Sequence, residues 1–185
     1  DGFVKPLGLW QKPAGERGKD WRVPRESVDD VVRTAFHTYD VVGFFGDPSH
    51  VLDSETGLRY WDALFDCWHR DYGRRLKTWA VPSGRDRHAV MFDMINTDIQ
   101  RRFVTAVDQA YTDITEGDFP HDGDARLRLH MLNARRQPTR VGMSIAKESR
   151  ESKRKIDLAI CAIGARMVRR EYLNRNSRSG GGQLW

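Results

Sequence analysis

The chain has 185 residues, enough for one domain with a substantial hydrophobic core, and 31% of them are charged. No stretch approaches the roughly 18 consecutive apolar residues of a membrane helix, and the N-terminus shows no signal-peptide pattern, so we expect no membrane contact. The net charge is +5, and the segment 147–178 alone carries ten Lys or Arg against four Asp or Glu. This basic segment fits a polyanion such as nucleic acid, although a solvated helix face explains it equally well.

Helical and strand-like patterns alternate along the first half of the chain. An apolar stripe predicts a helix over residues 25–38, and an amphipathic pattern predicts another over 59–72. Residues 3–10, the run VVGFFG at 41–46 and the alternating segment 76–81 each indicate a strand. Strands that alternate with helices predict an α/β sheet covered by helices on both faces.

The second half is predicted to be mainly helical. We expect helices over 87–112, 125–135 and 155–174, with a short strand near 140–146 between the last two. The Gly- and Ser-rich residues 175–185 are expected to form a flexible basic tail, which makes 1–174 the single domain. The two cysteines, Cys67 and Cys161, lack the spacing of a zinc site and are expected to be buried thiols in a reducing cytoplasm.

Two carboxylates stand at positions where chemistry collects in such folds. Asp47 follows the strand-like run 41–46 directly, and functional residues gather at the carboxyl ends of strands. An Asp-Pro turn is the alternative explanation for Asp47. Asp157 has apolar neighbours near the start of the last helix, where an unpaired carboxylate is costly unless a cation, a metal or the helix N-terminus stabilises it. Converging carboxylates would suit Mg²⁺ or Mn²⁺, but two alone would make a weak site.

The segment HDGD (121–124) is a further acidic group. Its two aspartates flank a glycine and could reach a metal, but Asp124 is also well placed as the N-cap of the helix that follows. We favour the capping role.

Four segments in order resemble the C-terminal nuclease domain of large terminases from actinobacteriophages. They are WRVPRESVDDVVRTAF, VVGFFGDPSH, HDGDARLRLHMLNA and KESRESKRKIDLAICAI. The resemblance runs over most of residues 2–170. It implies an α/β, RNase H-like mixed sheet flanked by helices, and a Mg²⁺- or Mn²⁺-dependent endonuclease that cuts concatemeric DNA during genome packaging.

The resemblance also assigns roles to residues. It places catalytic, metal-binding acids at Asp47 and Asp157, and an architectural or DNA-adjacent role on His130 and Asn133. A lysine precedes the late acidic motif of the family at the position of Lys147. Together with the charge pattern, this gives a set of expected DNA-binding residues: Lys147, Arg150, Lys153, Arg154 and Lys155.

One part of the family pattern is not matched. The family's first catalytic aspartate lies on a strand upstream of the one matched by residues 3–10, so we expect the sheet to lack its first strand and the fragment to cut weakly or not at all. The implied partners are double-stranded DNA, a terminase ATPase domain, the small terminase subunit and the portal, in the host cell cytoplasm. The alternatives are a non-catalytic DNA-binding or docking module, or another RNase H-like nuclease of resolvase or transposase type.

Overall fold

The computed structural model describes residues 2–48, 52, 57–149 and 152–179. It is a mixed α/β structure whose helices are α1 (Arg25–Thr38), α2 (Asp62–Tyr72), α3 (Thr97–Thr115), α4 (Ala125–Asn133) and α5 (Asp157–Ser179), with a one-turn helix, η1 (Glu16–Gly18). Two antiparallel strands, β1 (Arg135–Thr139) and β2 (Gly142–Ala146), form the regular sheet of the described residues. No helix among the described residues is long and apolar enough to cross a membrane.

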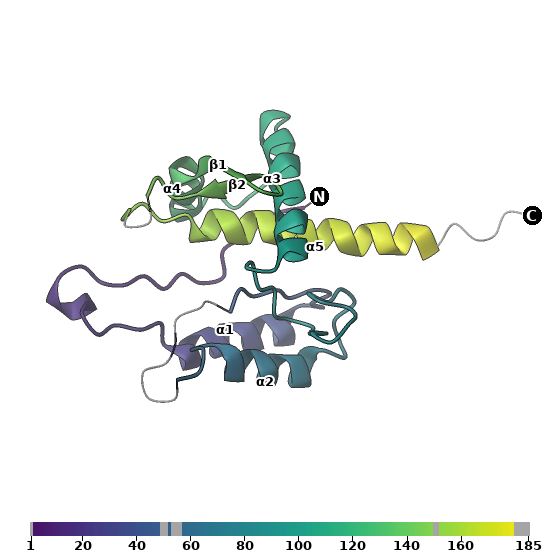
Figure 1. Ribbon diagram of the computed structural model, residues 1–185, viewed down its shortest axis with the longest axis horizontal. Coiled ribbons are helices and arrows are strands. Elements are labelled where there is room, and N and C mark those ends of the chain that lie inside the picture. The colour runs from purple at the N-terminus through teal and green to yellow at the C-terminus, as the bar shows by residue number, and fades with distance from the viewer. Residues whose placement is uncertain (1, 49–51, 53–56, 150–151, 180–185) are drawn as a thin grey trace, which may run out of the picture.

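An extended layer lies between two groups of helices (Figure 1). It consists of residues 41–46, 76–81 and 88–92, joined by isolated bridges instead of continuous strands: Gly43 to Thr78 and Gly46 to Met91 are parallel, and Val81 to His88 is antiparallel. The strand expected at 41–46 is therefore extended and parallel to its neighbours, but its pairing is sparse. Helices cover the layer on both sides, as expected.

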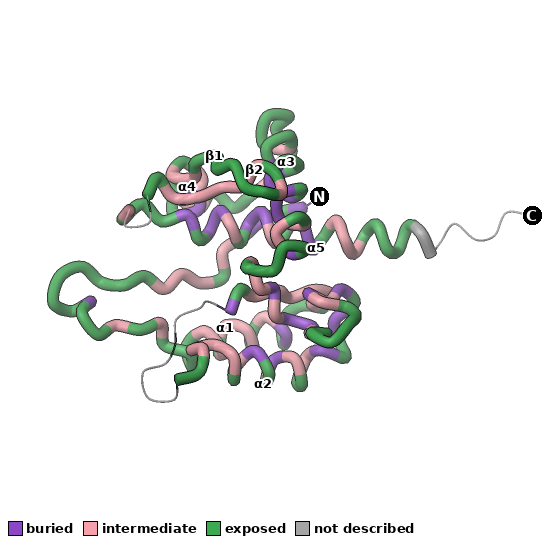
Figure 2. Tube along the Cα trace, viewed as in Figure 1, coloured by how far each residue is buried: buried purple, intermediate pink, exposed green. Residues whose placement is uncertain are grey.

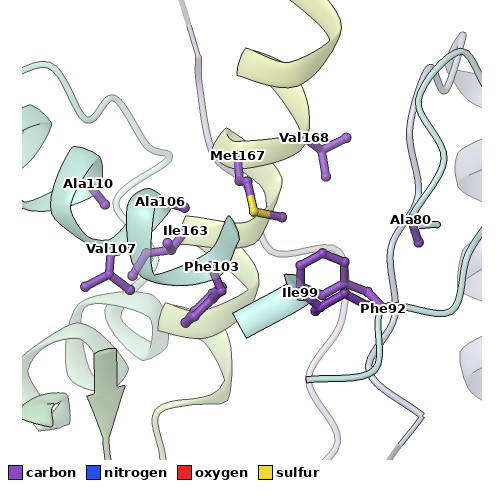
Figure 3. Packing of buried hydrophobic residues seen from close by; sticks show 10 residues of the cluster. All are labelled: Ala80, Phe92, Ile99, Phe103, Ala106, Val107, Ala110, Ile163, Met167 and Val168. Atoms are coloured by element: carbon purple, nitrogen blue, oxygen red, sulfur yellow. The ribbon is translucent and has the colours of Figure 1, made fainter. Parts of the chain in front are cut away.

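The core has two main parts, one on each side of the extended layer. On one side, Phe36 of α1 and Phe65 and Trp68 of α2 pack with Phe44, and Phe36 stacks on Tyr72 at 3.9 Å between ring centroids. The opposite side contains the cluster shown in Figure 3, where α3 and α5 pack together over Ala80 and Phe92 of the layer. Successive residues of 41–46 thus face opposite helix layers, which explains why this run is apolar throughout.

Several boundaries differ from those expected. Residues 88–92 are not helical, because His88 and Met91 form bridges on either side of a bend at 89–90. The long helix therefore begins at Thr97, where Asn96 accepts the backbone N–H groups of Asp98 and Ile99. The helix expected over 125–135 ends at Asn133, and Arg135 already begins a hairpin whose register pairs Arg135 with Ala146. At the C-terminus α5 continues past residue 174 to Ser179.

The N-terminal segment makes a single bridge instead of the strand expected over 3–10. Val4 pairs in parallel with His121, and its N–H donates to the carbonyl of Pro120 at 2.9 Å. Gly2 lies close to the α5 side chain Arg166, whose guanidinium donates to the Gly2 carbonyl at 2.9 Å. These contacts attach the N-terminal segment to α5 and to the loop before α4.

Candidate active site

Asp47 and Asp157 lie around one thiol, that of Cys161. Asp157 is the first residue of α5 and Cys161 follows one turn later, while Asp47 comes directly after the bridge at Gly46. Burial of the Cys161 thiol by surrounding protein raises its pKa, and the negative charges of Asp157 and Asp47 raise it further. The fold therefore brings two acids that are 110 positions apart in the sequence within electrostatic range of the same group.

The surroundings of Cys161 form an open groove. Cys161 lines two adjoining hollows of about 480 and 410 Å³, which also share Gly43 and Phe44 of the extended layer and Ala165 of α5. The expectation that both cysteines are buried is wrong, because Cys161 is exposed to solvent and Cys67 is only partly buried. The walls of the groove nevertheless remove part of the hydration of Cys161. A side chain in a concave surface can be open to solvent and still be partly dehydrated, which explains why Cys161 is exposed and yet has a raised pKa.

The groove runs along an edge of the extended layer that has few hydrogen bonds. The carbonyl of Val42 accepts from Lys77 and Thr78, and Gly46 exchanges bonds with Val90 and Phe92. Within the described part of the chain, no backbone–backbone hydrogen bond uses the N–H or C=O of Gly43 or Phe45. Because alternate residues of a strand direct these groups to opposite sides, this edge resembles that of a sheet whose next strand is missing.

Both carboxylates are exposed to solvent. The cost expected for a carboxylate at Asp157 in apolar surroundings therefore does not arise, because its apolar neighbours Ile156, Leu158 and Ala159 are buried while Asp157 itself is exposed. No ion pair joins Asp157 to Lys153, Arg154 or Lys155 among the residues with described placement. The helix N-terminus remains as a favourable environment for its charge.

Helix α4 fixes the start of α5 through two hydrogen bonds. The backbone N–H of Leu158, which has no partner within the helix, donates to Nδ1 of the buried His130 at 3.0 Å. Asn133 Nδ2 donates to the carbonyl of Lys155 at 3.0 Å. The resemblance left His130 and Asn133 with an architectural or DNA-adjacent role, and these contacts give both an architectural one.

The HDGD segment caps α4. The Asp124 carboxylate accepts the backbone N–H groups of Arg126 and Leu127 at 2.7 and 3.2 Å, and the Arg126 side chain, the largest influence, lowers the pKa of Asp124. Asp122 accepts the N–H of Asp124 at 3.1 Å. The capping role that we favoured for Asp124 is confirmed.

The expected DNA-binding residues lie between the hairpin and α5. Lys147 follows β2 directly, Lys153 and Lys155 are exposed, and Arg154 lies 3.4 Å from the Glu148 carboxylate at the surface. Arg150 is outside the described residues. An exposed pair of this kind contributes little stability, so Arg154 can exchange Glu148 for a phosphate at little cost.

A metal ion would find two acidic ligands here. Asp47 and Asp157 offer the hard carboxylate oxygens that Mg²⁺ and Mn²⁺ prefer. Across the described ranges, no group of three or more His, Cys, Asp or Glu side chains is arranged to hold a metal. The residues present thus fit part of a divalent-metal site.

Comparison with known proteins places the chain among phage sequences. It is 37% identical to the Gene 13 protein of Mycobacterium phage L5 and 36% identical to that of Mycobacterium phage D29, in each case over 184 residues. These matches cover 97% of the chain but 27% of each relative, so the chain spans about a quarter of their length. No family model matches, and no solved structure matches. The relatives support the expected phage origin.

Proposed function

We propose that this chain is part of the nuclease domain of a phage large terminase, which cuts concatemeric double-stranded DNA during genome packaging. The observation that carries the proposal is that the charges of Asp47 and Asp157 both act on the thiol of Cys161, which lines an open groove together with Asp47. The ordered resemblance of four segments to terminase nucleases supports it independently. The basic segment between β2 and α5 supplies cations for the phosphate backbone.

The RNase H-like fold is part of the same proposal. Within the described residues, Gly43 and Phe45 make no backbone–backbone hydrogen bond at this edge, and an apolar groove lies beside it. A sheet that lacks one strand would leave such an edge. Gly43 brings the layer close to α5, since a Cβ there would meet Val168 Cγ1 at 2.3 Å. A strand from elsewhere in a longer polypeptide would fit beside residues 41–46 and could supply the third acid at the Asp47 end.

In the complete site Asp47 and Asp157 would bind divalent metal. Bound Mg²⁺ or Mn²⁺ would make water a better nucleophile and stabilise the leaving oxygen in phosphodiester cleavage. The protein itself would supply position: the α4 bonds to Leu158 N–H and Lys155 carbonyl fix where Asp157 stands, and the surface lysines hold the duplex by its phosphates.

Plasmid nicking with Mn²⁺ tests the proposal. The chain alone, and a longer polypeptide that contains it with the missing strand, are compared. We expect nicking by the longer form and little by the chain alone. Asp47→Asn or Asp157→Asn should lower nicking by the longer form about 100-fold or more, because each removes a carboxylate that would hold the metal, and with it the charge stabilisation that the metal would give the reacting phosphate. The matched controls Asp86→Asn and Asp108→Asn change exposed acids elsewhere and should leave the rate unchanged.

A non-catalytic DNA-binding or docking module is the second candidate. The finding that favours it is the absence, over the described residues, of a third side chain able to complete a metal group. If the longer form binds plasmid but never nicks it, this second function replaces the first. If both Asp→Asn variants nick normally, the chain is a nuclease whose catalytic acids are not Asp47 and Asp157. A resolvase-type or transposase-type nuclease would nick but prefer branched or end-specific substrates over linear concatemers.

A further inference from the structure

The β1–β2 hairpin is a two-stranded ribbon whose outer strand lies against solvent. All five residues of β1 are exposed, whereas β2 is partly buried from Met143 onward (Figure 2). Ile145 packs against the α3–α5 cluster, and a Cβ at Gly142 would lie 2.6 Å from Val104 Cγ1 of α3. Helix α3 therefore supports β2 from behind and presents β1 outward.

Positive charge is concentrated on and around this ribbon. Arg135, Arg136 and Arg140 fall within six positions, and no Asp or Glu occurs between Asp124 and Glu148. Residues 125–157 together carry ten Lys or Arg and three Asp or Glu, a net +7, which leaves −2 for the remaining chain. Over the described residues no ion pair engages Arg135, Arg136 or Arg140. The ribbon thus lies within a cationic stretch, 125–157, and the residues outside that stretch carry a slight net negative charge.

The residue types on β1 favour phosphate over a protein surface. The strand reads Arg-Arg-Gln-Pro-Thr, with no large apolar side chain to form the buried centre that a stable protein interface needs. One guanidinium nitrogen of Arg135, Nη1, donates to the carbonyl of Leu132 at 3.0 Å. This bond holds the side chain beside the end of α4, and the other guanidinium nitrogens keep N–H groups that can bind a phosphate. Arg and Gln side chains are frequent donors to DNA phosphates.

The shape favours duplex DNA among the polyanions. A two-stranded β-ribbon fits the major groove of B-form DNA, whereas the major groove of A-form RNA is too deep and narrow. In the sequence, strand β2 is followed directly by the basic segment 147–155, and Asp157 comes two positions after Lys155. A duplex on the ribbon is therefore held by the part of the chain that leads to the candidate active site.

We propose that the β1–β2 ribbon is a duplex-DNA contact surface, with Arg135, Arg136 and Arg140 on the phosphate backbone, in addition to the basic segment 147–155. This inference rests on the proposed function for the identity of the substrate. The ribbon binds DNA whether or not the acids cut it, so binding in EDTA separates its failure from a failure of the nuclease assignment.

The test measures binding of the 185-residue chain to a 30-base-pair duplex across a salt series in EDTA. The triple variant Arg135→Gln, Arg136→Gln and Arg140→Gln is compared with a control that makes the same change at the exposed residues Arg17, Arg74 and Arg85. Both lose three charges. The ribbon variant should bind at least about tenfold more weakly, and its slope of log affinity against log salt should fall by about 2 to 3. The control should keep the wild-type slope.

A second variant keeps all three arginines, and with them the contacts of Arg135. Gln137→Glu places a carboxylate on the exposed strand and should weaken duplex binding, whereas Gln109→Glu on α3 should not. Equal binding by the ribbon triple and its control overturns the proposal. So does a loss of binding to a matched RNA duplex while DNA binding is retained.

Discussion

The two acids of the candidate site stand on regions that are built differently. At the junction of α4 and α5, side chains cap both helices: Asp124 accepts the first N–H groups of α4, and His130 accepts the N–H of Leu158. The extended layer that ends at Asp47 depends on isolated bridges and on tight packing against helices. The junction is complete within this chain, whereas the layer has an edge suited to another strand. One acid therefore begins a helix whose start is held by side-chain hydrogen bonds, and the other follows a sparsely paired segment.

Removing the His130 side chain should break the junction and give the largest loss of stability. His130→Ala leaves a cavity in the core and an unsatisfied N–H at Leu158, so we expect the free energy of unfolding to fall by about 3 kcal/mol. Urea denaturation measures the change. His37→Ala on the exposed side of α1 is the control and should change stability by less than about 0.5 kcal/mol. Similar losses from both would show that His130 is not the support of α5.

A methyl group at Gly43 should disturb the extended layer. In Gly43→Ala the new Cβ would lie 2.3 Å from Val168 Cγ1, so α5 or the layer must shift, at a cost of about 1–3 kcal/mol. Gly164→Ala is the matched control, because a Cβ there meets nothing within 4 Å. Alanine favours a helix over glycine, so this control should stabilise the chain by about 0.5–1 kcal/mol. Thermal unfolding of both variants gives the comparison, and the same sign of change for the two would contradict it.

Loss of the α4 cap should have a smaller effect on the junction. Asp124→Ala removes the acceptor of two backbone N–H groups, and the expected cost is about 1 kcal/mol. Asp124→Asn keeps the acceptor and should recover most of the stability. Amide hydrogen exchange of α4 should accelerate in the alanine variant alone. If exchange is unchanged in α4, the cap is not needed for this helix.

Mild acid should lower the free energy of unfolding, because one histidine in each region, His130 at the junction and His88 in the layer, favours the neutral form. Burial is the largest cause that lowers the pKa of His130 and of His88, and Nδ1 of each accepts backbone N–H groups, which also favours the neutral ring. The unfolded chain takes up protons near pH 6.5, so the free energy of unfolding should fall as pH drops below about 6.5. His130→Asn and His88→Asn replace Nδ1 by an oxygen that cannot be protonated there, and each should reduce the slope between pH 5 and 6.5. An unchanged slope in both variants would contradict this assignment.

Part of the candidate site could be predicted because its signals are local. Asp47 after an apolar run and Asp157 near the start of a helix could be identified by position alone. The contacts that place Asp157 could not be predicted, since His130 is 28 positions from Leu158 and a histidine on a helix gives no sign of its partner. The first strand of the ribbon was not predicted, because Arg135 and Arg136 are residue types that also suit the preceding helix α4. No local pattern indicates that they pair with Ala146 and Ile145.

The sequence by itself determined most of the helices. The stripe of Val28, Val32 and Phe36 specifies α1, and Asp124 specifies the start of α4, because helical hydrogen bonds and caps join residues a few positions apart. Tertiary structure alone decided that residues 88–92 join the layer instead of the helix, and that the charges of Asp47 and Asp157 both act on Cys161. The physical reason is range: pairing in the layer and convergence at the groove depend on segments tens of positions apart, whose contacts no local pattern encodes.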